Sequence, residues 1–189
     1  EMVRLLSASR MIAFDTETTG IDPLRAEIVG ISLAIREGEG YYIPLGHKDT
    51  ANQLPVAHVV AALTPVMTDP NISKVGHNIK FDALVLQNYG LQVTPLSFDT
   101  MIAEWLVDPA SRNLGLKDMA DTLLGISMTH IEELIGRGKN QISMDHVSIA
   151  AAAPYAAADA EVTLRLVPVT QKRMEEHLCT DIFEKIEMP

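Results

Sequence analysis

Short apolar runs in the first quarter of the chain predict β-strands. Residues 11–14 form a run that ends at Asp15, and residues 28–35 form a longer run that is rich in β-branched side chains. A third run, at 41–45, follows a glycine-containing turn, so we expect it to pair with the second run as a hairpin. The chain is therefore predicted to open as an antiparallel sheet.

From residue 56 onward the apolar positions recur at the spacing of helices. Residues 56–67 predict a helix, and after a short buried strand that begins at Val75, Asn78 is suited to cap a second helix that ends at Gly90. Pro154 is expected in the first turn of the longest helix. The later helices are predicted at 101–107, 116–124, about 154–174 and 181–187, and a short turn is predicted at 131–135. Strands followed by helices favour an α/β or α+β sheet with helices packed on it.

The composition fits one compact globular domain. The chain has 189 residues, of which 47% are hydrophobic and 21% charged, and this balance excludes disordered and low-complexity classes. The single cysteine, Cys179, excludes a disulfide framework and is typical of a reducing cytosol, so we expect a cytoplasmic protein. The most apolar tract, 149–160, is too short to span a membrane. Position 1 is not a methionine, which suggests a piece of a longer chain.

Acidic residues outnumber basic ones by 25 to 15, which gives a formal net charge of -10. A broad basic surface for nucleic acid is therefore disfavoured, and any nucleic acid would bind through local contacts or metal ions. Four basic residues lie near the motifs described below and are suited to contact phosphate: Lys80, Arg112, Arg137 and Lys139. With so few cations, we expect weak binding that depends only slightly on salt.

Two carboxylates end the first predicted strand. Asp15 and Glu17 are two residues apart, so their side chains share one face of the sheet and repel each other unless a cation lies between them. This pair alone leaves a solvated strand end as an alternative. Asp82 falls in the first turn of the helix after Asn78, where the helix dipole stabilises an anion.

Tyr155 and Asp159 are four residues apart on the last long helix, so they lie on one face. On their own they are equally compatible with a hydrogen-bonded pair at the edge of the core. Together, four acids from three elements offer the hard oxygen ligands that a pair of Mg²⁺ or Mn²⁺ ions requires. Since two such ions promote phosphodiester displacement, the pattern indicates phosphoryl hydrolysis.

Three motifs resemble the proofreading 3′-to-5′ exonucleases that carry four metal-site carboxylates and a tyrosine, known as the DEDDy group. The first is Phe-Asp-Thr-Glu-Thr-Thr-Gly at 14–20, the second is Val-Gly-His-Asn-Ile-Lys-Phe-Asp at 75–82, and the third runs from Tyr155 to Thr163. The histidine branch of that group has its base at the position of Pro154, so the tyrosine branch is favoured. The resemblance implies a ribonuclease-H-like fold, a mixed sheet with helices packed on it.

Four further segments are similar to the exonuclease domain of bacterial DNA polymerase I: 42–47, 98–101, 138–141 and 181–189. This resemblance implies a 3′-to-5′ exonuclease domain at 1–175. It also implies a C-terminal segment at 176–189 that leads toward a polymerase domain absent from this chain. Pro154, His77 and Phe81 depart from residues that are common in the family, and none of these departures removes a metal ligand.

The resemblance also implies roles for single residues. Asp15, Glu17 and Asp159 would hold the tighter of two divalent ions, Mg²⁺ or Mn²⁺, while Asp15 and Asp82 would serve the second, partly through water. Tyr155 would orient the attacking water, because a phenol with an ordinary pKa near 10 stays protonated at neutral pH. The expected activity is release of 5′-mononucleotides from the 3′ end of single-stranded DNA.

Three residues are implied to bind the substrate: Ile21 and Phe81 against the terminal bases, and Asn78 at the last nucleotides. Core packing or helix capping is the alternative for each of them. Asp99 also matches a family position, and we interpret it as a helix N-cap rather than as a ligand.

Two other functions stay open on the sequence. A ribonuclease-D-like 3′-to-5′ exoribonuclease shares the four acids and the tyrosine. A catalytically silent structural domain of a polymerase shares the fold, although all five catalytic positions are intact here.

Overall fold

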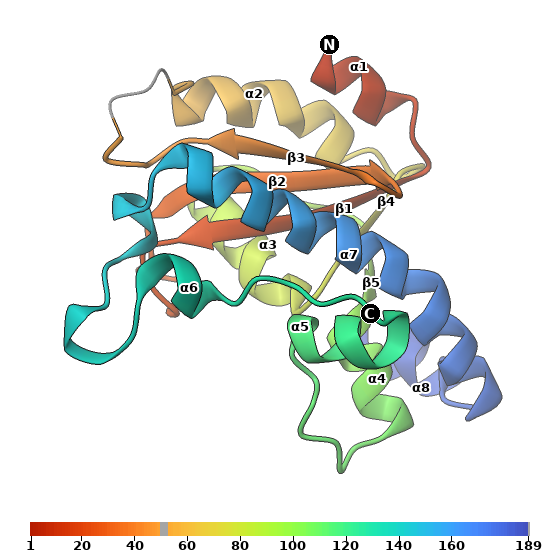
Figure 1. The fold of residues 1–189 in the computed structure, drawn as a ribbon. Helices are drawn as coiled ribbons and strands as arrows, with labels where there is room; N and C mark the ends of the chain where they lie inside the picture. The colour runs from red at the N-terminus through yellow and green to blue at the C-terminus, as the bar shows by residue number, and fades with distance from the viewer. Residues whose placement is uncertain (50–52, 189) are drawn as a thin grey trace.

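The computed structural model describes residues 1–49 and 53–188, which fold around one five-stranded sheet (Figure 1). The strands are β1 (Met11–Thr18), β2 (Ile28–Arg36), β3 (Glu39–Pro44), β4 (Ser73–Gly76) and β5 (Leu96–Asp99). Their order is β3-β2-β1-β4-β5. The pairs β1–β2 and β2–β3 are antiparallel, as expected for the opening hairpins, whereas β1–β4 and β4–β5 are parallel. The predicted mixed sheet is confirmed.

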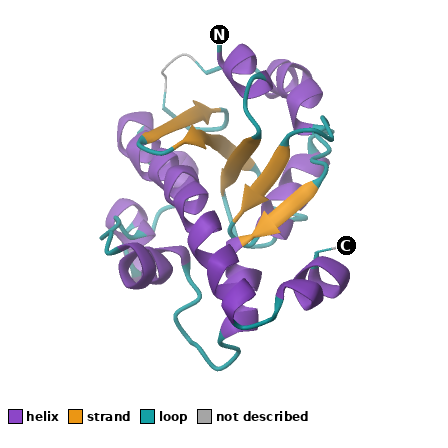
Figure 2. Cartoon of the chain, turned by 90° about the vertical axis from the view of Figure 1, so that its right-hand side faces the viewer, coloured by secondary structure: helices purple, strands orange, loops and turns teal. Residues whose placement is uncertain are grey.

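Helices cover both faces of this sheet. They are α1 (Met2–Ser7), α2 (Val56–Met67), α3 (Ile79–Asn88), α4 (Thr100–Val107), α5 (Leu116–Met119), α6 (Ile131–Ile135), α7 (Ile149–Glu176) and α8 (Thr180–Ile182). Short helical turns follow or connect them: η1 (Ala120–Leu124), η2 (Gly138–Asn140), η3 (Met144–His146) and η4 (Phe183–Glu187). The long helix α7 runs across β1, β2 and β3 on one face, as Figures 1 and 2 show. None of the helices in the described ranges is long and apolar enough to cross a bilayer.

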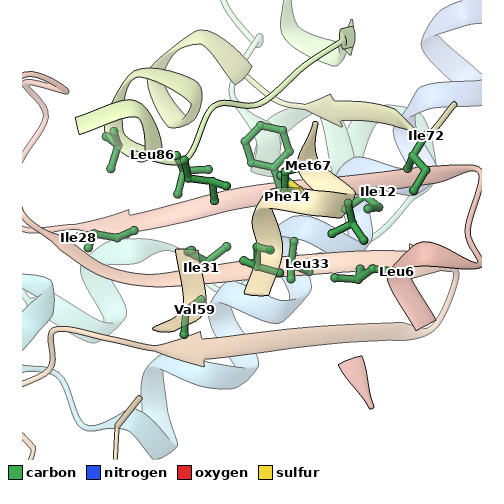
Figure 3. Packing of buried hydrophobic residues seen from close by; sticks show 14 of the residues in the cluster. Leu6, Ile12, Phe14, Ile28, Ile31, Leu33, Val59, Met67, Ile72 and Leu86 are labelled. Carbon is green, nitrogen blue, oxygen red and sulfur yellow. The ribbon is translucent and has the colours of Figure 1, made fainter. Parts of the chain in front are cut away.

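The alternation of side chains along β1 separates two hydrophobic clusters. Ile12 and Phe14 pack with buried residues of α1, α2 and α3 (Figure 3), whereas Ala13 packs with residues of α4 and α7. Because side chains alternate along a strand, Asp15 and Glu17 lie on the face of Ala13, which α7 covers. The two carboxylates therefore point toward the helix that carries the third motif.

Small side chains allow α7 to lie close to the sheet. Ala13 and Ala34, which pair across β1 and β2, share a buried cluster with Ala160 of α7. At Gly40 the approach is closer still, since a Cβ there would lie 2.2 Å from the carbonyl oxygen of Ala157. Glycine at this position therefore allows α7 to pack directly against β3.

Most of the predicted elements are confirmed, but several details were wrong or missed. The longest helix begins at Ile149, capped by Ser148, and not near Pro154. Pro154 is tolerated inside the helix because both it and Ala150, whose carbonyl loses a partner, are exposed to water. The short elements α1 and β5 were not predicted.

Candidate functional site

Three of the four predicted metal ligands come together between β1 and α7. Asp15 and Glu17 lie at the end of β1, and Asp159 lies on the buried side of α7. One carboxylate oxygen of each residue lies within 4.8 Å of the others. This geometry follows from the strand alternation, which directs two acids toward α7, and from the close approach of the helix, which supplies the third.

Burial and mutual repulsion raise the pKa of these acids. Burial is the main cause for Asp15, whose pKa lies well above its ordinary value, and the charges of neighbouring acids add to it. Burial, followed by the charge of Asp159, raises the pKa of Glu17 to about 8. Such a group ionises fully only when a cation compensates it. The donor set, carboxylate oxygens alone, fits Mg²⁺ or Mn²⁺ rather than a softer metal.

Asp82 is not one of these three residues, but after burial its charge is the largest cause of the raised pKa of Asp15. The Oδ1 atom of Asp82 accepts hydrogen bonds from the backbone amide of Thr16 at 2.8 Å and from its hydroxyl at 2.6 Å. The partner strand β4 pairs with β1 only along residues 11–13. Beyond that point the Asp82 carboxylate, rather than a strand, accepts the hydrogen bond of the Thr16 backbone amide. Burial raises the pKa of Asp82 to about 7, although both hydrogen bonds from Thr16 oppose the shift. Its role as a ligand of a second ion stays a prediction.

Tyr155 lies one helical turn before Asp159, at the same site. Burial and then the negative charge of Asp159 raise the pKa of the phenol. Tyr155 therefore stays protonated at neutral pH, and its role in orienting a water molecule stays a prediction.

Lys117 of α5 is a functional candidate that was not predicted from the sequence. Its ammonium group forms an ion pair with Asp159 and lies 4.4 Å from the centroid of the Tyr155 ring. Lys117 is not among the four basic residues named above from the sequence, Lys80, Arg112, Arg137 and Lys139, whose contact with phosphate stays a prediction. Those four are exposed, whereas the side chain of Lys117 is only 16% exposed. The available signal was its position at the edge of an apolar helical stripe, three residues before Ala120.

A groove of about 560 Å³ opens beside Glu17. Ile21 and Phe81, two of the three predicted substrate contacts, line it, and the side chain of Ile21 is 96% exposed. The lining also includes Ile131 and Ile142, which are exposed as well and which were not predicted as substrate contacts. The groove thus offers apolar side chains to solvent next to the acidic cluster.

The start of α3 is capped by Asp99 and not, as predicted, by the side chain of Asn78. Asn78 occupies the N-cap position of α3 in a left-handed conformation, but its side chain makes no capping hydrogen bond. Asp99 instead accepts hydrogen bonds from the amides of Asn78 and Ile79, and from those of Met101 and Ile102 in α4. The interpretation of Asp99 as an N-cap is confirmed, and it serves two helices. The side chain of Asn78 is left exposed, and its contact with nucleotides stays a prediction.

Comparisons with known proteins find relatives along the whole of this chain. A family model described as 3′-5′ exonuclease matches residues 1–175. The DNA polymerase I of Chloroflexus aurantiacus is 43% identical over 192 residues, which cover 100% of this chain and 20% of that protein. The DNA polymerase I of Pseudomonas aeruginosa is 36% identical over 99% of this chain and 21% of that protein. The chain therefore spans about a fifth of the length of these curated relatives.

Solved structures share the fold. Brucella melitensis NrnC with bound Mg²⁺ superposes with a TM-score of 0.70 at 25% identity, over 92% of this chain and 77% of that one. Escherichia coli RNase D, an exoribonuclease, gives a TM-score of 0.68 at 20% identity, over 94% of this chain and 43% of that one. With the strand order described above, these likenesses confirm the ribonuclease-H-like fold class.

Proposed function

Because this chain belongs to the 3′-5′ exonuclease family found in DNA polymerase I, we propose that it removes 5′-mononucleotides from the 3′ end of single-stranded DNA with the help of two divalent metal ions. The observation that carries the proposal is the grouping of Asp15, Glu17 and Asp159 beside an exposed apolar groove. In the parent chain this activity would proofread for a polymerase domain that follows residues 176–189.

The carboxylates support the metal part of the proposal. Asp15, Glu17 and Asp159 would hold one ion, and Asp15 with Asp82 would hold the other. When bound, such ions supply an activated water and stabilise the leaving oxygen of a phosphodiester. Because these acids are buried together, their ionised forms are unfavourable unless cations compensate them.

The remaining residues support recognition of a single strand. The protonated phenol of Tyr155 is suited to donate a hydrogen bond that orients the attacking water. Ile21 and Phe81 offer apolar surface to unstacked bases, a contact that does not depend on sequence. With a net charge of -10, the chain gains little from phosphate contacts, so a neighbouring domain would have to hold the DNA nearby.

The test is metal-dependent digestion of a 5′-labelled DNA strand and of an RNA strand with the same sequence. Wild-type protein should shorten the DNA from its 3′ end in Mg²⁺ and not in EDTA. Asp15→Asn should abolish this activity, while the exposed control Asp181→Asn should not. Preferential digestion of RNA would instead indicate a ribonuclease-D-like enzyme. Inactivity on both strands in Mg²⁺ and in Mn²⁺ would indicate a silent structural domain.

A further inference from the structure

Lys117 brings a positive charge to the two functional side chains of α7. It lies 42 residues before Asp159 in the chain, on a different helix, and its ammonium donates a hydrogen bond to Asp159 Oδ1. The same Nζ atom lies over the ring of Tyr155, 4.4 Å from its centroid. Because Tyr155 and Asp159 are one turn apart, a single ammonium group contacts both.

The packing of α5 against α7 holds Lys117 in this place. Met119 and the adjoining Ala120 are buried in one cluster with Val162 and Leu166 of α7. The lysine side chain is 16% exposed and that of Asp159 is 9% exposed, so the pair is largely removed from water. Burial of an ammonium group is unfavourable unless an anion compensates it, and here the anion is a predicted metal ligand.

The charge of Lys117 reaches the whole acidic cluster. It lowers the pKa of Asp15, of Glu17 and of Asp159, against the effects of burial and of their mutual repulsion. The ammonium thus provides part of the compensation that a metal ion would provide. Since Asp159 Oδ1 is turned toward Lys117, a divalent ion that binds this carboxylate competes with the ammonium for its negative charge.

We propose that Lys117 is an internal counter-ion of the acidic cluster, which holds Asp159 and Tyr155 in place while no metal is bound and leaves Asp159 when a divalent ion binds. This inference rests on the proposed function, because it takes Asp15, Glu17 and Asp159 as the metal site. It adds that Lys117 and the metal ion compete for the carboxylate of Asp159. The binding of metal should therefore be coupled to a movement of the Lys117 side chain.

The first experiment compares Lys117→Met and Lys117→Arg with wild-type protein, and uses Lys172→Met as a matched control. Lys172 is 76% exposed and forms an ion pair with Glu176 on the same helix. In EDTA, Lys117→Met should lower the melting temperature by about 5 °C, since it leaves buried carboxylates without their counter-ion. Its affinity for Mn²⁺, measured by calorimetry, should rise about tenfold because the competitor is absent. Lys117→Arg should keep most of the stability, and the control should match wild-type protein in both measurements.

The second experiment needs no destabilising variant. The side-chain ¹⁵N resonance of a lysine ammonium held in a buried ion pair is observable by NMR, and that of Lys117 is identified by its absence from Lys117→Arg. Adding Mg²⁺ to wild-type protein should shift this resonance or broaden it beyond detection. If Mg²⁺ leaves this ammonium resonance unchanged, the proposal that the ion displaces Lys117 from Asp159 is wrong.

The outcomes separate this inference from the proposed function. If wild-type protein binds Mn²⁺ and Lys117→Met binds it with equal affinity and melts at the wild-type temperature in EDTA, only the role of Lys117 is overturned. If wild-type protein binds neither Mn²⁺ nor Mg²⁺, the metal site itself is wrong, and the displacement of Lys117 fails with it.

Discussion

Asp82 accepts two hydrogen bonds from Thr16, one from the backbone amide and one from the hydroxyl, both at its Oδ1 atom. Thr16 stands between Asp15 and Glu17, so the two faces of β1 are tied to different helices. The acids face α7, and the threonine is fixed to α3. Asp82 thereby determines where the end of the strand lies, whether or not it also binds a metal ion.

Replacement of Thr16 tests this role of Asp82. Thr16→Val keeps the shape of the side chain and removes the hydroxyl, which should cost about 1–3 kcal/mol because a buried carboxylate loses a donor. Thr16→Ser should stay close to wild-type stability, as it retains the hydroxyl. Urea unfolding in EDTA measures both variants. Equal stability of the valine and serine variants would show that the hydroxyl is not important.

Loss of the Asp99 carboxylate should affect two helices together. Asp99→Ala removes the acceptor for four backbone amides at the starts of α3 and α4, and we expect a loss of about 2–4 kcal/mol, more than one ordinary N-cap provides. Asp99→Asn, which retains one acceptor oxygen, should lose less. Hydrogen exchange of the amides at the starts of both helices gives the readout, and increased exchange in α4 alone would contradict a shared cap.

Tyr155→Phe should separate orientation of water from metal binding. Without the hydroxyl, we expect kcat for mononucleotide release to fall by about 10- to 100-fold, because the attacking water is less well placed. Mn²⁺ affinity from calorimetry should stay within about twofold of wild-type protein, since no carboxylate is removed. A large fall in metal affinity would instead assign Tyr155 a structural role at the cluster.

The stability of the metal-free protein should decrease as the pH rises. Burial raises the pKa of Glu17 to about 8 from 4.5, and that of Asp82 to about 7 from 3.8. Between the unfolded and folded values the native state holds more protons than the unfolded chain, so stability present at low pH is lost as the pH rises through this window. In EDTA, melting temperatures should therefore be higher near pH 5 than near pH 8.

Glu17→Gln is the control for this pH dependence, because it removes one of the two titrating groups. Its melting temperature in EDTA should vary less with pH than that of wild-type protein. Saturating Mg²⁺ should also reduce the dependence, since the ion favours the ionised carboxylates. A wild-type melting temperature that rises from acid to neutral pH in EDTA would contradict the raised pKa values.

Ile21 should contribute to substrate affinity and not to stability. Its side chain is 96% exposed, so Ile21→Ala should leave the melting temperature unchanged. We expect the KM for single-stranded DNA to rise about fivefold through loss of apolar contact in the groove. Leu24→Ala, at a nearby residue that is 70% exposed, is the matched control. Equal effects of the two substitutions would remove Ile21 from the binding site.

Features that depend on neighbouring residues in the chain could be predicted from the sequence. The strand and hairpin at 28–45 and the helix at 56–67 follow from local apolar spacing and from turn residues. The shared face of Asp15 and Glu17 follows from strand geometry alone, as the shared face of Tyr155 and Asp159 follows from helix geometry. The three motifs can therefore be recognised from the order of residues alone.

Contacts between distant residues were decided only by the tertiary structure. Nothing local indicates that Lys117 reaches Asp159, that Asp82 bonds to Thr16 across 66 residues, or that Asp99 caps two helices. The helix start predicted at Pro154 was likewise too late. A proline inside a helix leaves the carbonyl four residues earlier without a partner, and the sequence does not show that this carbonyl, of Ala150, is exposed to water. Such contacts arise from the packing of whole elements, which brings side chains together at distances that local spacing does not encode.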